Sequence, residues 1–218
     1  MRLRPRGLVG SGSSGSAAGK PDGSNDFSSQ RWKRCATPKR AANSDHFANG
    51  DSMTLNSLEF RRAMGCFATG VTIITVDLEG EVHGMTANAF ASVSLDPMLV
   101  LVCVDHSTRT HAHLHAKKRF GINILRKDQR AISEYYARTE RDHEHAETEA
   151  GARFERTRHG TPALHGALAY LECKLRSAEV AGDHSIFIAE VDDVVVREGD
   201  PLLFFRGKYR KLGEEVEK

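Results

Sequence analysis

The stretch "GMTANAFASVSLDP", residues 84–97, places small hydroxyl and amide side chains among alanines. A helix, at about 100° per residue, would scatter the polar side chains around its circumference, whereas the two-residue period of a β-strand gathers them. We therefore predict a strand with a buried, alanine-rich face and a polar face of low bulk. The polar face suits either solvent or a flat ligand that lies close to the backbone. The predicted buried face holds Met85, Ala87, Ala89, Ala91, Val93 and Leu95, and the polar face holds Gly84, Thr86, Asn88, Phe90, Ser92 and Ser94.

Further strands are expected on both sides of this stretch. "VTIITVD" (71–77), a turn through "LEGE", a strand over 82–94 and "MLVLVCVD" (98–105) predict an antiparallel meander, with Pro97 breaking the last connection. Later runs of strand character cover 119–125, 167–182, 184–196 and 201–212. About seven strands with few helices and tight turns predict one closed or nearly closed β-barrel rather than a parallel sheet.

Helices are expected at three places between these strands. The first begins in "SLEFRRAMGCFATG", where Asn56 or Ser57 provides the N-cap and Gly65 or Gly70 the end. The second spans about residues 108–117.

The third helix is expected to begin at Asp128 and to carry Ile132, Tyr135 and Tyr136 on its apolar face. The segment that follows it, residues 138–153, is highly charged and lacks periodicity. We interpret this segment as a mobile loop or lid.

The first 53 residues differ in composition from the rest of the chain. They are rich in Gly, Ser, Arg, Lys and Asn, and 10–26 contains almost no apolar side chains. Such a segment buries too little surface to offset the entropy of ordering, so residues 1–53 are predicted to be a disordered basic tail and 54–218 the folded domain. The tail has no apolar segment typical of a secretory signal, and Met53 is a candidate internal start.

Composition limits the possible partners of the chain. It has 218 residues and a formal net charge of +2, from 31 basic and 29 acidic residues, which argues against nucleic acid as a partner. No apolar run approaches the roughly 20 residues that span a bilayer, so a soluble, cytoplasmic protein is expected. The four cysteines show neither CxxC nor zinc spacing. Cys103 and Cys173 lie in apolar runs and are interpreted as buried, inert thiols.

The histidines of "DHSTRTHAHLHAKK" are the first candidates for a metal site. On a helix, His111 and His115 share a face at i, i+4, but no carboxylate or cysteine follows at a recognisable spacing for a third ligand. We therefore predict solvated surface histidines and no metal.

The usual motifs of hydrolases, zinc peptidases and Rossmann enzymes are missing, so an enzyme with this sequence needs a cofactor to supply its reactivity. The stretch "AGDHSIFIAEV" is the other candidate. Gly182 allows a turn, Asp183 can bond the local backbone, and His184 enters a strand. From these residues alone, His184 is either a turn histidine or a ligand contact.

Several segments together resemble a known family. "FATGVTIITV", "GMTANAFASVSLDPMLVLVCVD", "FGINIL", "GTPALHGALAYLECKL", "AGDHSIFIAEV" and "PLLFFRGKY" occur in the order seen in the flavin reductase family of FMN-binding split-barrel proteins. That family includes the small reductase components of two-component flavin-dependent monooxygenases. The resemblance covers about residues 58–212. It implies a mainly β, Greek-key-like split barrel with flanking helices, which forms a homodimer.

The resemblance also implies a flavin site. The ring would lie in a groove near the dimer interface, along the polar face of 84–94, and the flavin would be FMN, with FAD possible. The phosphate would lie where the strand over 98–105 meets the following helix, whose first N–H groups are unpaired. The implied flavin contacts are Thr72, Thr86, Ala87, Asn88, Ser92, Ser94, Asp105, Ser107, Thr108 and Lys117.

The activity implied by the resemblance is hydride transfer from C4 of NADH or NADPH to N5 of the flavin, which then leaves for a monooxygenase partner. His184 would be the catalytic residue that orders the nicotinamide, next to Asp183. Arg206, Lys208 and Tyr209 would assist with its phosphates or ring. The alternatives are an electron-transfer flavoprotein that retains FMN and a non-enzymatic flavin-binding module.

Overall fold

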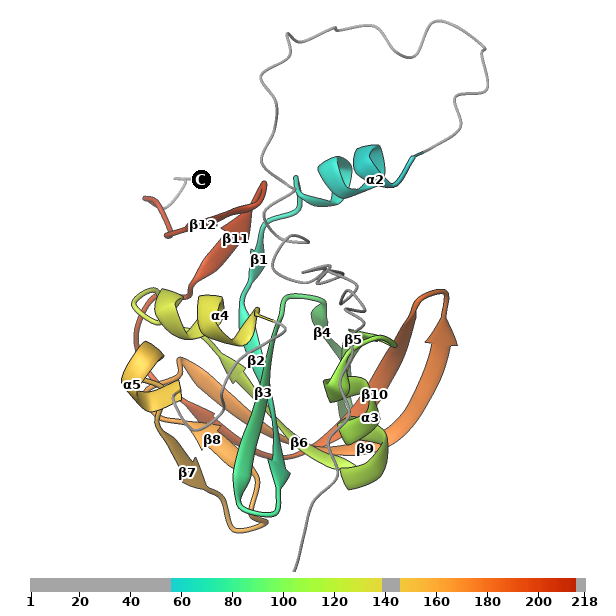
Figure 1. The fold of residues 1–218 in the computed structure, drawn as a ribbon, viewed down its shortest axis with the longest axis vertical. Helices are drawn as coiled ribbons and strands as arrows, with labels where there is room; N and C mark the ends of the chain where they lie inside the picture. The colour runs from blue at the N-terminus through green and yellow to red at the C-terminus, as the bar shows by residue number, and fades with distance from the viewer. Residues whose placement is uncertain (1–55, 139–145, 215–218) are drawn as a thin grey trace, which may run out of the picture.

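The computed structural model describes residues 56–138 and 146–214. The expected tail over 1–53 and part of the charged segment 138–153 lie outside these residues. Strands dominate the described chain and form sheets of seven, three and two strands. Figure 1 shows the large sheet curving into an incomplete barrel, with helices packed against it.

The seven-stranded sheet is antiparallel throughout, with the order β3-β2-β6-β9-β10-β5-β4. Because β3 and β4 are its two edges and do not pair with each other, the barrel is split rather than closed. The mainly β split-barrel prediction is therefore confirmed. The strands are β2 (Thr72–Leu78), β3 (Glu81–Ala87), β4 (Phe90–Leu95), β5 (Met98–Asp105), β6 (Arg119–Ile124), β9 (Ala169–Ala181) and β10 (His184–Val196).

The structure corrects the prediction of one strand over 82–94. The chain leaves β3 after Ala87, turns at Asn88 and Ala89, and enters β4. The turn is held by Cys103 of β5, whose N–H donates to the Ala89 carbonyl at 3.0 Å. β2–β3 and β4–β5 are hairpins as expected, but they lie at opposite edges of the sheet, so the meander was wrong.

The predicted buried, alanine-rich face is also wrong beyond this turn. Ala91, Val93 and Leu95 are exposed, because β4 is an edge strand and a bulge between Ser92 and Ser94 breaks the alternation. Only the part of the face that lies in β3 is covered, where Ala87 is buried and Met85 half-buried.

A smaller sheet projects from the barrel and is formed by β1 (Thr69–Gly70), β11 (Leu203–Phe205) and β12 (Lys208–Arg210). Next to it lies α2 (Ser57–Met64), whose N-cap is Asn56, as expected: its side chain accepts N–H bonds from the first turn. The helix ends at Gly65. The third sheet pairs β7 (Phe154–Arg156) with β8 (Pro162–Leu164).

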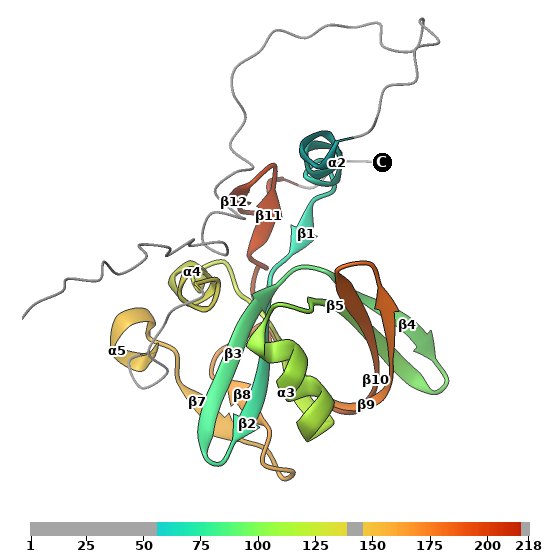
Figure 2. The ribbon, with the colours of Figure 1, turned by 45° about the vertical axis from the view of Figure 1, so that its right-hand side comes forward.

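The other helices cover the barrel. Figure 2 shows α3 (Arg109–Lys117) lying across the barrel beside β2, β3 and β5. The helix that was expected to begin at Asp128 is α4 (Arg130–Tyr136). Its N-cap is Gln129 and not Asp128, because the Asp128 carboxylate pairs with Arg126 instead. Residues Ala146–Ala150 form α5, so this part of the predicted loop is helical. No helix in the described ranges has the length and apolar character needed to cross a membrane.

The core has two parts, one on each face of the large sheet. Inside the barrel, Phe120, Phe187 and Leu114 of α3 are fully buried among valines of β5. Outside it, Ile132, Tyr135 and Tyr136 of α4 pack on Ile73. Each side chain of this size stabilises the fold by about 1.5–3 kcal/mol when fully buried, so both helices are firmly held.

The absence of a side chain at Gly84 has a packing explanation. A Cβ added at Gly84 would lie 2.6 Å from the ring of Tyr136. The missing side chain therefore lets α4 approach β3 closely, and it is explained by packing rather than by a ligand.

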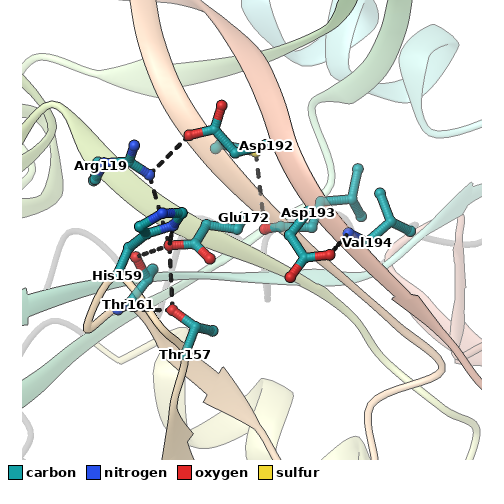
Figure 3. Close-up of polar contacts among 10 residues, drawn as sticks. Arg119, Thr157, His159, Thr161, Glu172, Asp192, Asp193 and Val194 are labelled. Carbon is teal, nitrogen blue, oxygen red and sulfur yellow. Dashed lines mark hydrogen bonds and ion pairs between the residues drawn. The ribbon is translucent and has the colours of Figure 1, made fainter.

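A buried carboxylate anchors the loop between β7 and β8, as Figure 3 shows. Glu172 of β9 is fully buried, and its Oε1 accepts hydroxyl hydrogen bonds from Thr161 at 2.9 Å and Thr157 at 3.2 Å. The same oxygen lies 3.1 Å from Nδ1 of His159 and 3.7 Å from Arg119. Because one oxygen serves three groups of the loop, Glu172 fixes the loop to the barrel wall.

Candidate functional site

A small hollow lies where the polar end of β3 meets α4 and the small sheet. Both polar and apolar side chains line it, and its volume of about 10 Å³ is that of a water molecule, so a larger ligand can only lie against its rim. Sequence-predicted Thr86, Asn88 and Tyr209 all lie here. The residues that line it are Val71, Thr86, Asn88, Ser133, Ala137, Phe204 and Tyr209.

Ser133 of α4 connects the walls of this hollow. Its carbonyl accepts the Thr86 hydroxyl hydrogen bond at 2.7 Å, and its own hydroxyl lies 2.9 Å from the Tyr209 hydroxyl. Burial raises the pKa of Tyr209, so its hydroxyl stays protonated, and the guanidinium of Arg130 lies 5.3 Å from the centre of its ring. β3, α4 and β12 therefore form one rigid wall around the hollow.

The backbone next to the hollow has hydrogen-bonding groups that the sheet does not use. β3 is an edge strand, so N–H and C=O groups on its outer side do not pair with another strand. Asn88 donates from Nδ2 to the Thr69 hydroxyl at 3.1 Å, which orients its amide. An edge strand beside an oriented amide can hydrogen-bond the polar edge of a planar ligand.

Thr72 and Ala87 support this edge from behind. Thr72 is buried, and its hydroxyl donates to the Ala87 carbonyl at 2.8 Å. The Thr72 hydroxyl therefore has no second hydrogen to donate to a ligand.

A second set of predicted residues gathers where β5 ends beside the β9–β10 hairpin. His184 is the register partner of Asp105, and its Nδ1 lies 2.6 Å from the Asp183 carboxylate. The hydrogen bond from His184 lowers the pKa of Asp183, so this carboxylate stays ionised to a lower pH than usual. The two carboxylates and the imidazole approach within 4.8 Å of one another. Hydrogen bonding in these turns accounts for this clustering, and we assign no metal ligand here.

The same edge carries the start of α3. The Asp105 carboxylate accepts hydrogen bonds from the Ser107 N–H and hydroxyl, and Thr108 caps the helix by accepting from the His111 N–H. The unpaired N–H groups of this first turn suit an anion. Lys117 does not join them, because it lies at the other end of α3, about 12 Å along a helix that rises 1.5 Å per residue.

The residues around the hollow and the edge formed by Asp105 and His184 are connected through the turn at Asn88 and Ala89. Cys103, whose N–H holds the Ala89 carbonyl, precedes Asp105 by two strand residues, about 7 Å. Asp105 and its partner His184 therefore lie about two strand residues along β5 from the point that holds this turn.

The remaining predicted contacts are more dispersed. Ser92 is exposed on β4, and the Ser94 hydroxyl accepts the Asp96 N–H at 3.2 Å within the β4–β5 turn. Arg206 lies in the β11–β12 turn with φ 49°, and its guanidinium lies 5.2 Å from the centre of the Phe205 ring. Lys208 is exposed on β12. The structure does not bring these residues to the hollow.

Four residues that line the hollow were missed by the sequence analysis, namely Val71, Ser133, Ala137 and Phe204. Ser133 is fully buried within a helix whose other covered residues are apolar or aromatic. A serine at a helical position that faces the core is the signal that could have identified it. No sequence signal placed Phe204 here, because only the β1–β11 pairing brings it next to Thr69.

Cysteine chemistry does not contribute to this site within the described residues. Cys66, Cys103 and Cys173 are free thiols. Cys173 is buried as predicted and burial raises its pKa, while Cys103 is half-buried with its pKa raised by the same cause. Both therefore favour the protonated, unreactive form at neutral pH.

Comparison with known proteins identifies the class of protein that this fold and site define. The model of the flavin reductase like domain matches residues 64–213. The chain is 39% identical over 158 residues to an NADH-dependent flavin reductase from a Rhodococcus species, covering 71% of this chain and 86% of the relative. The chain belongs to the flavin reductase like family.

Two further relatives are informative. The reductase component of a 4-nitrophenol 4-monooxygenase/4-nitrocatechol 2-monooxygenase from Rhodococcus opacus is 37% identical, with 71% of this chain and 80% of that protein covered. The solved structure of the NADH:FAD oxidoreductase SgcE6 of Streptomyces globisporus C-1027, in complex with NAD and FAD fragments, is 33% identical. It superposes with a TM-score of 0.67 over 73% of this chain and 94% of that one.

Proposed function

We propose that this protein is an NADH-dependent flavin reductase that supplies reduced flavin to a monooxygenase. The observation that carries the proposal is the pair of polar sets on either side of the turn at Asn88–Ala89, on a chain of this family. One set offers a place for a flat ring, and the other offers a helix N-terminus and an imidazole. A flavin bound beside a reduced nicotinamide supplies the redox chemistry by accepting a hydride.

The residues of β3 hold the flavin in this proposal. Backbone groups of Thr86 and Ala87 and the Asn88 amide bond the polar edge of the ring, and Tyr209 closes the hollow next to Ser133. We include FMN and FAD, because a ring-binding edge does not read the part of the molecule in which they differ.

The edge formed by β5 and β10 lies where the flavin phosphate and the dinucleotide meet. The first turn of α3, capped by Thr108, stabilises the flavin phosphate, and His184, oriented by Asp183, contacts the nicotinamide end of the dinucleotide. Hydride transfer depends on stacking of the two rings and needs little proton transfer, which explains why no acid–base pair is required.

Oxidation of NADH, followed as loss of absorbance at 340 nm with FMN, FAD or riboflavin added, tests this function. Turnover that requires added flavin supports a reductase with diffusible flavin, and parallel assays with NADPH measure the preference between donors. A yellow colour retained through desalting would favour an electron-transfer flavoprotein. A folded protein that oxidises neither donor with any flavin would be a binding module instead.

His184→Ala should raise the KM for NADH about tenfold, since loss of one or two hydrogen bonds to a ligand costs about 1.4 kcal/mol. Flavin affinity, measured by fluorescence quenching, should stay within about twofold because the hollow is untouched. His165→Ala is the matched control, because His165 is an exposed histidine beyond the other end of β9. Equal loss of NADH and flavin binding in His184→Ala would rule out this role.

We also propose a cytoplasmic homodimer. Leu95 at the β4–β5 turn is 90% exposed, and Met98 and Val93 beside it are also exposed. Apolar side chains gathered on an edge hairpin are typical of a covered interface. Sedimentation at micromolar concentration measures the oligomeric state, and a monomer would contradict the proposal.

A further inference from the structure

A buried hydroxyl joins two histidines behind the proposed dinucleotide edge. Ser185 is 2% exposed, and its Oγ lies 3.0 Å from Nε2 of His106 and 3.0 Å from Nε2 of His111. His106 belongs to the turn after β5, His111 to α3, and Ser185 to β10. One side chain therefore ties together three elements that carry the dinucleotide site.

The number of hydrogens shared by Ser185 and the two imidazoles limits the protonation states in which the bridge can form. A serine hydroxyl donates one hydrogen bond, so with Ser185 donating to one imidazole, the other imidazole donates to Ser185. Both neutral imidazoles, or one neutral and one protonated, satisfy all three groups. When both are protonated, His106 and His111 each present an N–H, and the buried hydroxyl hydrogen loses its acceptor.

The surroundings also oppose a second proton. The rings of His106 and His111 are 4.9 Å apart, and His115 contacts His111 at 4.8 Å from the other side. Phe187 of β10, which is fully buried, packs against His111 at 5.3 Å. Burial, and then the charges of His115 and His106, lower the pKa of His111, whereas Asp105 acts in the opposite direction.

We propose that Ser185 is a positioning residue for dinucleotide binding, acting through the bridge from His106 to His111. The bridge fixes turn 105–108 beside His184 and holds only while at least one of its two imidazoles is neutral. This proposal rests on the proposed function, because His184, which precedes Ser185 and lies beside the turn, matters for catalysis only if it contacts NADH. Doubly protonated, the cluster releases the exposed His106 side chain into solvent, and the turn keeps only its backbone hydrogen bond from His106 to Asp183.

The consequence is a KM that depends on pH. His111 has a lowered pKa, so its neutral form persists below its ordinary value of 6.5, and the bridge is lost only as pH falls further. The KM for NADH should rise about tenfold between pH 7.5 and a pH well below 6.5, while kcat changes by less than about twofold.

Three variants separate this role from general stability. Ser185→Ala removes the bridge, so its KM at pH 7.5 should already be raised about fivefold and should change little with pH. His106→Gln keeps a side chain that bonds the serine but takes up no proton. It should keep the KM of the unaltered protein at pH 7.5 and lose the rise at acid pH.

Thr110→Val is the matched control. It removes the buried hydroxyl hydrogen bond of α3 to His83, 2.7 Å long, and leaves the Ser185 bridge in place. This variant should keep the full pH dependence of KM. If Thr110→Val flattens the profile as Ser185→Ala does, the effect is one of helix stability and the proposal is overturned.

An NMR titration of the imidazole nitrogens reads the bridge without catalysis. In the unaltered protein His111 should take up its proton at a lower pH than in Ser185→Ala, because the bridge favours a neutral imidazole. A lower protonation pH in the unaltered protein with no NADH oxidation would support the bridge and overturn the proposed function. The same protonation pH of His111 in both proteins, or the same KM profile in Ser185→Ala, would overturn the bridge itself.

Discussion

Glu172→Leu should lower the free energy of unfolding by about 3 kcal/mol, because it leaves the hydroxyls of buried Thr161 and half-buried Thr157 without their acceptor. Thr161 and Thr157 both donate to the Glu172 carboxylate, and His159 and Arg119 face the same oxygen (Figure 3). Urea denaturation followed by circular dichroism measures the loss. Glu172→Gln keeps an acceptor oxygen and should cost only about 1 kcal/mol.

The control for this prediction lies on the same strand. Glu179 of β9 is exposed, so Glu179→Leu should change stability by less than about 0.5 kcal/mol. If Glu172→Leu proved as mild as Glu179→Leu, the hydrogen bonds of the buried carboxylate would contribute nothing net, and the loop between β7 and β8 would be held by packing alone.

Asn88→Leu should raise the Kd for FMN at least tenfold, since an oriented amide is lost from the edge where the ring is proposed to bind, at a cost of about 1.4 kcal/mol. Leucine also places apolar branches beside the outer edge of β3. A titration of flavin fluorescence at constant protein concentration measures the Kd.

Thr69→Val separates a direct contact from an indirect one. It removes the 3.1 Å hydrogen bond from Asn88 but keeps the Asn88 amide itself. Its Kd for FMN should rise by less than about threefold if Asn88 touches the ligand. A rise as large as that of Asn88→Leu would mean that Asn88 acts only by holding the turn, and an unchanged Kd in Asn88→Leu would place the ring elsewhere.

The sequence analysis was correct for elements that depend on residues close to one another in the chain. The cap at Asn56, the helix after Thr108 and the hairpins of β2 with β3 and β4 with β5 all depend on residues close in sequence. The same holds for the turn at Gly182, which has a positive φ. Such contacts require no information about distant strands, so side-chain pattern alone predicted them.

Predictions were wrong where contact with a distant strand determines the local structure. The alternation through 84–97 continues across Asn88 and Ala89, but Cys103 bonds the Ala89 carbonyl and draws the chain from one edge of the sheet to the other. Alternation of side chains predicts which face of a strand each residue lies on. It does not predict where a hydrogen bond from another strand ends that strand.

The sequence by itself determined that this protein is mainly β, with its polar residues gathered along 84–94 and at Asp183–His184. The tertiary structure decided which of them meet. Ser133 joins Thr86, 47 residues before it, to Tyr209, 76 residues after it, and Ser185 joins His106 to His111. Hydrogen bonds between residues so far apart depend on how the sheet curves and where the helices dock, because only packing brings their partners within 3 Å.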